Sequence, residues 1–122
     1  MDNPRTFRDL TVWHKDIALT KQIYAVTQNM PETERFGLTN QMRRAAVSIP
    51  SNIAEVNARQ HTKDYIRFLV VARASLAELE TQVIIAHELQ FLSQSRELIT
   101  AMQEISRMLQ GLIASLRRKA AN

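Results

Sequence analysis

Four long segments of this chain carry apolar residues at steps of three or four positions, with only short breaks between the segments. The clearest stripe lies in the last segment and consists of Leu98, Met102, Ile105, Leu109, Leu112 and Leu116. This spacing follows the α-helical period and places one apolar face against a core. Only 2 glycines occur in 122 residues, too few for the tight turns of a β-rich domain. The pattern therefore predicts an all-α fold.

Local signals divide the chain into separate helices. Pro31 ends the first helix because the residue before a proline avoids the helical conformation, Gly37 precedes the second helix, and Thr62 is a suitable N-cap for the third. The expected helices cover about 9–29, 38–59, 62–89 and 93–119. Short connections favour antiparallel neighbours, so residues 1–122 are expected to form one antiparallel up-down four-helix bundle.

Several kinds of chemistry have no counterpart in the sequence. The absence of cysteine excludes a disulfide scaffold, a thiolate zinc site and a cysteine nucleophile. His14, His61 and His87 lie on different segments without a second ligand one turn away, so no metal site and no cofactor are predicted. No glycine-rich phosphate loop or nucleophile elbow is present, which favours a non-enzymatic protein. The polar start and the lack of an apolar run of about 18 residues predict a cytoplasmic protein with no membrane segment.

The second segment has an unusual polar stripe beside its apolar side. At steps of three and four, one face carries Gln41, Arg44, Ser48, Asn52, Glu55 and Arg59. The stripe is either solvated surface or a structural hydrogen-bonded network, in which Glu55 meets Arg59 one turn further on, and the network is favoured. Pro50 lies inside this pattern. It is expected to kink the helix near Ala46 and Val47, or to break it into two short helices.

The first and third segments carry more apolar surface than one core-facing stripe requires. The surplus residues are Leu10, Trp13, Ile17, Tyr24, Ile66 and Val70. Because monomers rarely expose large apolar patches, the surplus predicts a homo-oligomer interface. The alternative is that each helix has a single wide core-facing side.

Charge is distributed unevenly along the chain. The overall net charge of +4 results from +4 in residues 41–75, −4 in residues 76–105 and +4 in residues 106–122. Arginine suits phosphate groups, so an RNA- or DNA-binding surface is predicted at Arg43, Arg44, Arg59, Lys63, Arg67, Arg73, Arg117, Arg118 and Lys119. These side chains would neutralise the nucleic-acid backbone. In the alternative, the basic and acidic blocks neutralise each other on the bundle surface.

Four motifs follow one another between residues 7 and 92. They are F-x-x-L-x-V-W at Phe7 to Trp13; I-Y at Ile23 and Tyr24 with a turn at Pro31-Glu32-Thr33-Glu34; F-G-L-T-x-Q-x-R-R-A-x-x-S-I-x-x-N-I-A-E at Phe36 to Glu55; and F-L-x-x-A-x-x-S-L-x-E-L-E at Phe68 to Glu80. In this combination the chain resembles the bacterial four-helix-bundle proteins related to the 23S ribosomal RNA intervening-sequence protein. Val56 stands where that family usually has glycine.

The resemblance implies an up-down bundle that assembles into a ring-like homopentamer. It also implies a relation to accessory proteins of diversity-generating retroelements, which bind a reverse transcriptase and nucleic acid. The resulting hypothesis is a non-enzymatic oligomer that binds RNA or DNA through an arginine-rich surface. The alternative is a protein-interaction scaffold or accessory subunit that does not bind nucleic acid directly.

Overall fold

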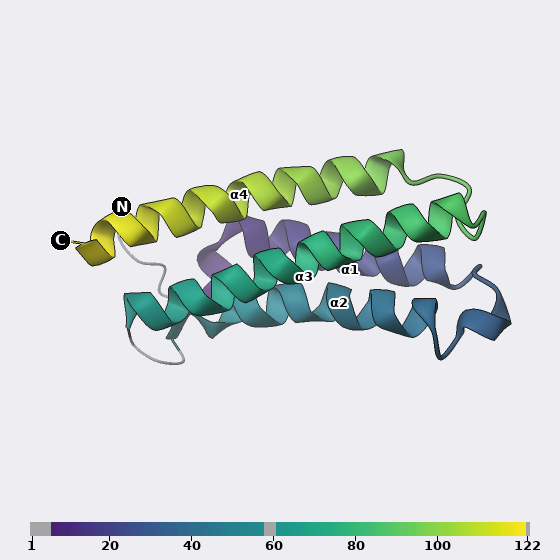
Figure 1. The fold of residues 1–122 in the computed structure, drawn as a ribbon. Helices are drawn as coiled ribbons and strands as arrows, with labels where there is room; N and C mark the ends of the chain where they lie inside the picture. The colour runs from purple at the N-terminus through teal and green to yellow at the C-terminus, as the bar shows by residue number, and fades with distance from the viewer. Residues whose placement is uncertain (1–5, 58–60, 122) are drawn as a thin grey trace.

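The computed structural model describes residues 6–57 and 61–121, and these residues form four long helices and no strand (Figure 1). The helices are α1 (Thr11–Thr27), α2 (Leu38–Ile53), α3 (Thr62–Glu88) and α4 (Arg96–Ala121). Short 3-10 turns precede α1 (Phe7–Asp9), precede α2 (Glu32–Glu34) and follow α2 (Ala54–Asn57). The predicted all-α four-helix fold is confirmed.

Helix ends differ from the sequence prediction where local hydrogen bonding decides them. The first helix begins at Thr11 instead of residue 9, because a capped 3-10 turn comes first: the Arg8 N–H donates to Thr6 Oγ1 at 3.0 Å. The second helix ends at Ile53, six residues earlier than predicted, and a 3-10 turn follows it. α4 begins at Arg96, three residues later than predicted.

Each helix packs against two neighbours, so that the order around the bundle is α1, α2, α3, α4 and back to α1 (Figure 1). The centre is apolar, and five of the six residues predicted as the stripe of the last segment are buried; Leu112 is half-buried, and Ile113 is buried beside it. In this arrangement the boundary between α1 and α2 lies opposite the boundary between α3 and α4. No described helix has both the length and the apolar content needed to cross a membrane.

α2 runs through Pro50 without interruption, so the alternative of two short helices is wrong. Proline has no N–H, and the carbonyl of Ala46 therefore loses its usual donor four residues later in the helix. The nearest replacement donor is on a neighbouring helix, where Thr20 Oγ1 of α1 lies 3.3 Å from the Ala46 oxygen, but its single proton is shared with a second acceptor. The same hydroxyl lies 2.9 Å from the Asp16 backbone oxygen, one turn earlier in α1.

The core contains one carboxyl group that the apolar pattern did not reveal. Asp16 lies between Val12 and Leu19 on the buried side of α1 and is 0% exposed. Neither of its carboxylate oxygens has a hydrogen-bond partner among the described residues. Burial raises the pKa of Asp16 to about 8, so the neutral acid predominates at pH 7.

Candidate nucleic-acid interface

Contacts between the helices fix their relative heights along the bundle. Thr20 on α1 meets Ala46 on α2, and Ser48 on α2 meets Ser75 on α3 at 3.0 Å. A small groove brings Ser106 of α4 beside the middle of α3. At these heights, one half of the bundle comprises residues 6–18, 48–57, 61–75 and 106–121, and the other half comprises residues 19–47 and 76–105.

The first of these halves is strongly basic. With the neutral Asp16 set aside, it carries nine basic and three acidic side chains, whereas the other half carries five basic and seven acidic ones. One ion pair crosses the boundary: Lys15 Nζ lies 2.6 Å from Glu104 Oε1, and this hydrogen bond and the Lys15 charge lower the pKa of Glu104. Positive charge is therefore concentrated at one end of the molecule.

Exposed cations from three elements gather at that end. Figure 1 shows the start of the described chain, the first turn of α3 and the last turn of α4 at the same end of the bundle. We call the exposed cations there the basic end: Arg8, Lys63, Arg67, Arg117, Arg118 and Lys119. Five of them belong to the predicted surface. Arg8 was missed because it lies outside the basic blocks of the sequence, and only the fold brings it to this end.

Other predicted cations lie elsewhere. The heights place Arg43 about 20 Å along the axis from Arg67, since thirteen helical residues separate the two levels. Arg43 joins α2 to α1: its Nε donates to Thr27 Oγ1 at 2.8 Å, and its guanidinium lies 4.7 Å from the Tyr24 ring centroid. Arg44 is exposed in the same half as Arg43.

Two cations remain from the predicted surface. Arg73 lies on α3 in the basic half, where it lines the small groove between α3 and α4. Arg59 lies outside the described residues.

The polar stripe of α2 makes hydrogen bonds only over its central part among the described residues. Asn52 Nδ2 donates to the Ser48 carbonyl at 2.7 Å, and Ser48 Oγ lies 3.0 Å from Ser75 Oγ on α3. Ser75 was not among the residues that the sequence predicted for this network. Gln41 and Arg44 are exposed, and no described residue hydrogen-bonds with their side chains. Glu55 is half-buried, and its predicted partner Arg59 is not described.

The surplus apolar residues lie on two opposite sides of the bundle. Leu10, Trp13 and Ile66 are half-buried against the core, and Ile17 is also half-buried. Tyr24 and Val70 are 41% and 43% exposed.

Two surfaces can be defined from these positions. Tyr24 lies beside Arg43 of α2, and residues at helical spacing extend its surface. The α1–α2 face consists of Trp13, Ile17, Tyr24 and Val47. Val70 lines the groove next to α4. The α3–α4 face consists of Val70, Ala74, Ala77 and Ile84.

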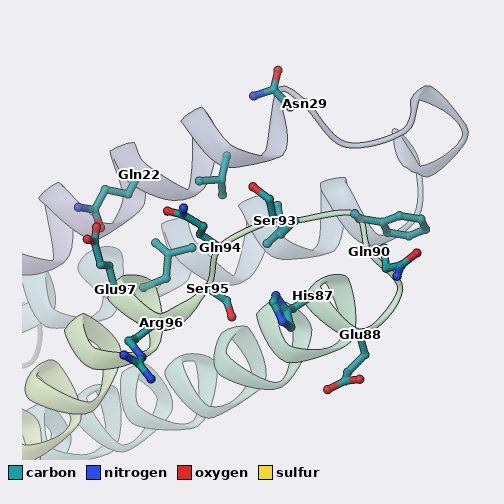
Figure 2. Close-up of a pocket in the computed structure, with 14 residues that line it drawn as sticks. Gln22, Asn29, His87, Glu88, Gln90, Ser93, Gln94, Ser95, Arg96 and Glu97 are labelled. Carbon is teal, nitrogen blue, oxygen red and sulfur yellow. The ribbon is translucent and has the colours of Figure 1, made fainter.

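A wider, open groove of about 1330 Å³ is drawn in Figure 2, and the connection from α3 to α4 that lines it lies at the opposite end of the bundle from the basic end (Figure 1). It runs between α1 and the connection from α3 to α4, and Figure 2 shows amide, hydroxyl, cationic and acidic side chains around it: Gln22, Asn29, His87, Glu88, Gln94, Ser95, Arg96 and Glu97. Among residues 6–57 and 61–121, no group of three metal-ligating side chains is arranged to hold a metal ion. This groove mixes both signs of charge, so the basic end is the better candidate for binding a polyanion.

Comparison with known proteins identifies a match to a family model. No curated protein matches the chain. The model of the 23S rRNA-intervening sequence protein family matches residues 8–111. The match includes Arg8, Lys63 and Arg67 of the basic end and stops before the last turns of α4. Because it spans most of the 122 residues, this chain belongs to the family of 23S rRNA-intervening sequence proteins.

Proposed function

We propose that this protein is a non-enzymatic, self-associating helical bundle that binds the backbone of RNA or DNA through its basic end. The observation that carries the proposal is the concentration of nine basic against three acidic side chains in one half of the bundle. Exposed arginine and lysine side chains attract phosphates, and arginine also forms two parallel hydrogen bonds with one phosphate group. The family description refers to 23S rRNA, which makes RNA the first ligand to test.

Backbone contacts rather than base reading are expected at this surface. The basic end consists of cations, and the nearby Phe7 ring is already covered by the Arg8 guanidinium at 4.7 Å from the ring centroid. Phosphate contacts position a nucleic acid but carry little sequence information. We therefore expect binding to depend strongly on salt and weakly on sequence.

The experiment measures binding of labelled single-stranded RNA and duplex DNA between 50 and 200 mM salt. If all six cations of the basic end meet phosphates, log K falls against log salt with a slope of about −4 to −5. Replacing Arg117 and Arg118 by alanine should reduce the steepness of this slope by about 1.5 to 2. Arg44→Ala is the matched control, since this exposed arginine lies in the other half. No salt-sensitive binding at 50 mM, or an equal loss with Arg44→Ala, would overturn the proposal.

Self-association is supported by the two exposed apolar faces on opposite sides of the bundle. Val47 and Val70 are each 43% exposed and Ile84 is 46% exposed, and a second copy would remove this surface from water. Mass measurement in solution tests the assembly, and a pentamer is the state expected from the family resemblance. The same faces favour the second candidate function, a protein-interaction scaffold, which would be indicated by stable assembly without any salt-sensitive nucleic-acid binding.

A further inference from the structure

The two apolar faces differ in shape. On the α1–α2 face, the Tyr24 ring is 41% exposed and carries the Arg43 guanidinium against it. On the α3–α4 face there is a groove of about 370 Å³, and its lining residues are Val70, Arg73, Ala74, Leu76, Ala77, Glu80 and Ser106. One face thus offers an aromatic projection, and the other offers a hollow with small alanine side chains in its lining.

The two faces also carry opposite charges at the same height. Arg43 lies five residues before Ser48 on α2, and Glu80 lies five residues after Ser75 on α3. Ser48 and Ser75 are hydrogen-bonded and the two helices are antiparallel, so these displacements bring Arg43 and Glu80 to the same level on opposite sides of the bundle. Tyr24 is at this level as well, because it touches Arg43.

Neither charge has an ion-pair partner among residues 6–57 and 61–121. No carboxylate lies within 4 Å of the Arg43 guanidinium, and no cation lies within 4 Å of Glu80, among the described residues. Arg43 donates hydrogen bonds from Nε to Thr27 Oγ1 and from Nη2 to the Tyr24 carbonyl. The N–H groups of Nη1 therefore remain available for another acceptor. A half-buried arginine and a half-buried glutamate at one level therefore provide a complementary pair between two copies.

We propose that the α1–α2 face of one copy docks against the α3–α4 face of the next, with Tyr24 in the groove and Arg43 paired with Glu80 of the partner subunit. This inference rests on the proposed self-association and names the surfaces that produce it. Two different faces on one subunit make a head-to-tail contact, which produces a ring when the rotation between neighbouring copies closes and an open filament when it does not. Because the matching residues are at one height, neighbouring copies are related by rotation about an axis roughly parallel to the helices.

Charge reversal and groove filling test this docking, with mass in solution as the readout over a dilution series. Arg43→Glu and Glu80→Arg should each weaken assembly about tenfold or more, because like charges would then face each other across the contact. The double variant should restore assembly. Ala77→Arg, at an exposed position, should block the groove without disturbing the core. Arg44→Glu is the control and should assemble normally.

The outcomes distinguish a failure of this docking from a failure of the proposed self-association. A monomeric unaltered protein would overturn the proposed self-association, and the docking with it. An oligomer that persists unchanged with Glu80→Arg and with Ala77→Arg would overturn the docking alone. Thermal unfolding of each variant is recorded in parallel, since Arg43 also joins α2 to α1. Failure of the double variant to recover, while its melting temperature is unchanged, would also contradict the Arg43–Glu80 pair.

Discussion

Asp16 should make the stability of this protein fall as the pH rises through the neutral range. In the unfolded chain its pKa is near 3.8, whereas burial raises the pKa of the folded protein's Asp16 to about 8. Below about pH 4 the carboxyl group is protonated in both states and its ionisation costs nothing. Between about pH 4 and pH 8 the unfolded chain releases this proton and the folded chain retains it, so the folded state loses relative stability with each pH unit.

The magnitude follows from the two pKa values. One unit of difference corresponds to 1.36 kcal/mol, so a difference of about four units amounts to roughly 5 kcal/mol over the whole window. Above about pH 8 both states are ionised and the loss levels off. This order of magnitude is comparable with the total stability of many small domains, so the effect should be readily measurable.

Asp16→Asn is the matched variant because the amide has a similar shape and does not titrate. Urea unfolding followed by circular dichroism, at one protein concentration and at steps from pH 4.5 to pH 8.5, gives the free energy of unfolding of both proteins. Surface groups titrate alike in both, so they cancel in the difference. The unaltered protein should lose several kcal/mol relative to the variant as the pH rises. Parallel stability curves for the two proteins would refute the reasoning.

Two further predictions concern hydrogen bonds between helices. Thr20→Val removes the donor near the Ala46 carbonyl and should lower the free energy of unfolding by about 1–2 kcal/mol. The loss should be clearly smaller in a Pro50→Ala background, because the helix there regains its own N–H donor. A double-mutant cycle by urea unfolding measures the coupling between the two positions, and purely additive effects would contradict this role of Thr20. Tyr65→Phe removes the hydroxyl that donates to the Ile53 carbonyl at 3.0 Å. The free energy of unfolding should fall by about 1 kcal/mol, which corresponds to about 4 °C in melting temperature for a chain of this length. Calorimetry measures this shift, and an unchanged melting temperature would contradict the prediction.

The sequence allowed the helices and most of the core to be predicted because helical period is a local property. Leu98 to Leu116 repeat at helical steps, and the structure buries this face. Asp16 was overlooked for the same reason: a search for apolar residues passes over a polar residue that takes a core position. The α2 boundary was also placed too late, since apolar Val56 continues the pattern while Glu55 leaves helical geometry at φ −77° and ψ 20°.

The candidate site was harder to predict because it depends on how helices are aligned with one another. Arg44 and Arg67 belong to one basic block of the sequence, yet an antiparallel hairpin carries them to different halves of the bundle. Conversely, Arg8 and Arg118 are separated by most of the chain and meet at one end because an up-down bundle of four helices returns to its starting side. Neither fact follows from spacing within a single helix.

The described residues begin at Thr6 and end at Ala121 on the same side of the bundle, and this has a practical consequence for binding experiments. A purification handle or fluorescent protein joined at either end is attached only a few residues along the chain from Arg8 or Lys119, so its bulk can screen these cations, and a histidine tag adds imidazole groups of its own. The connection between α1 and α2, around Thr33, is the distant attachment point. Binding measured with a label there reports on the protein itself, whereas an end-labelled sample measures the label as well.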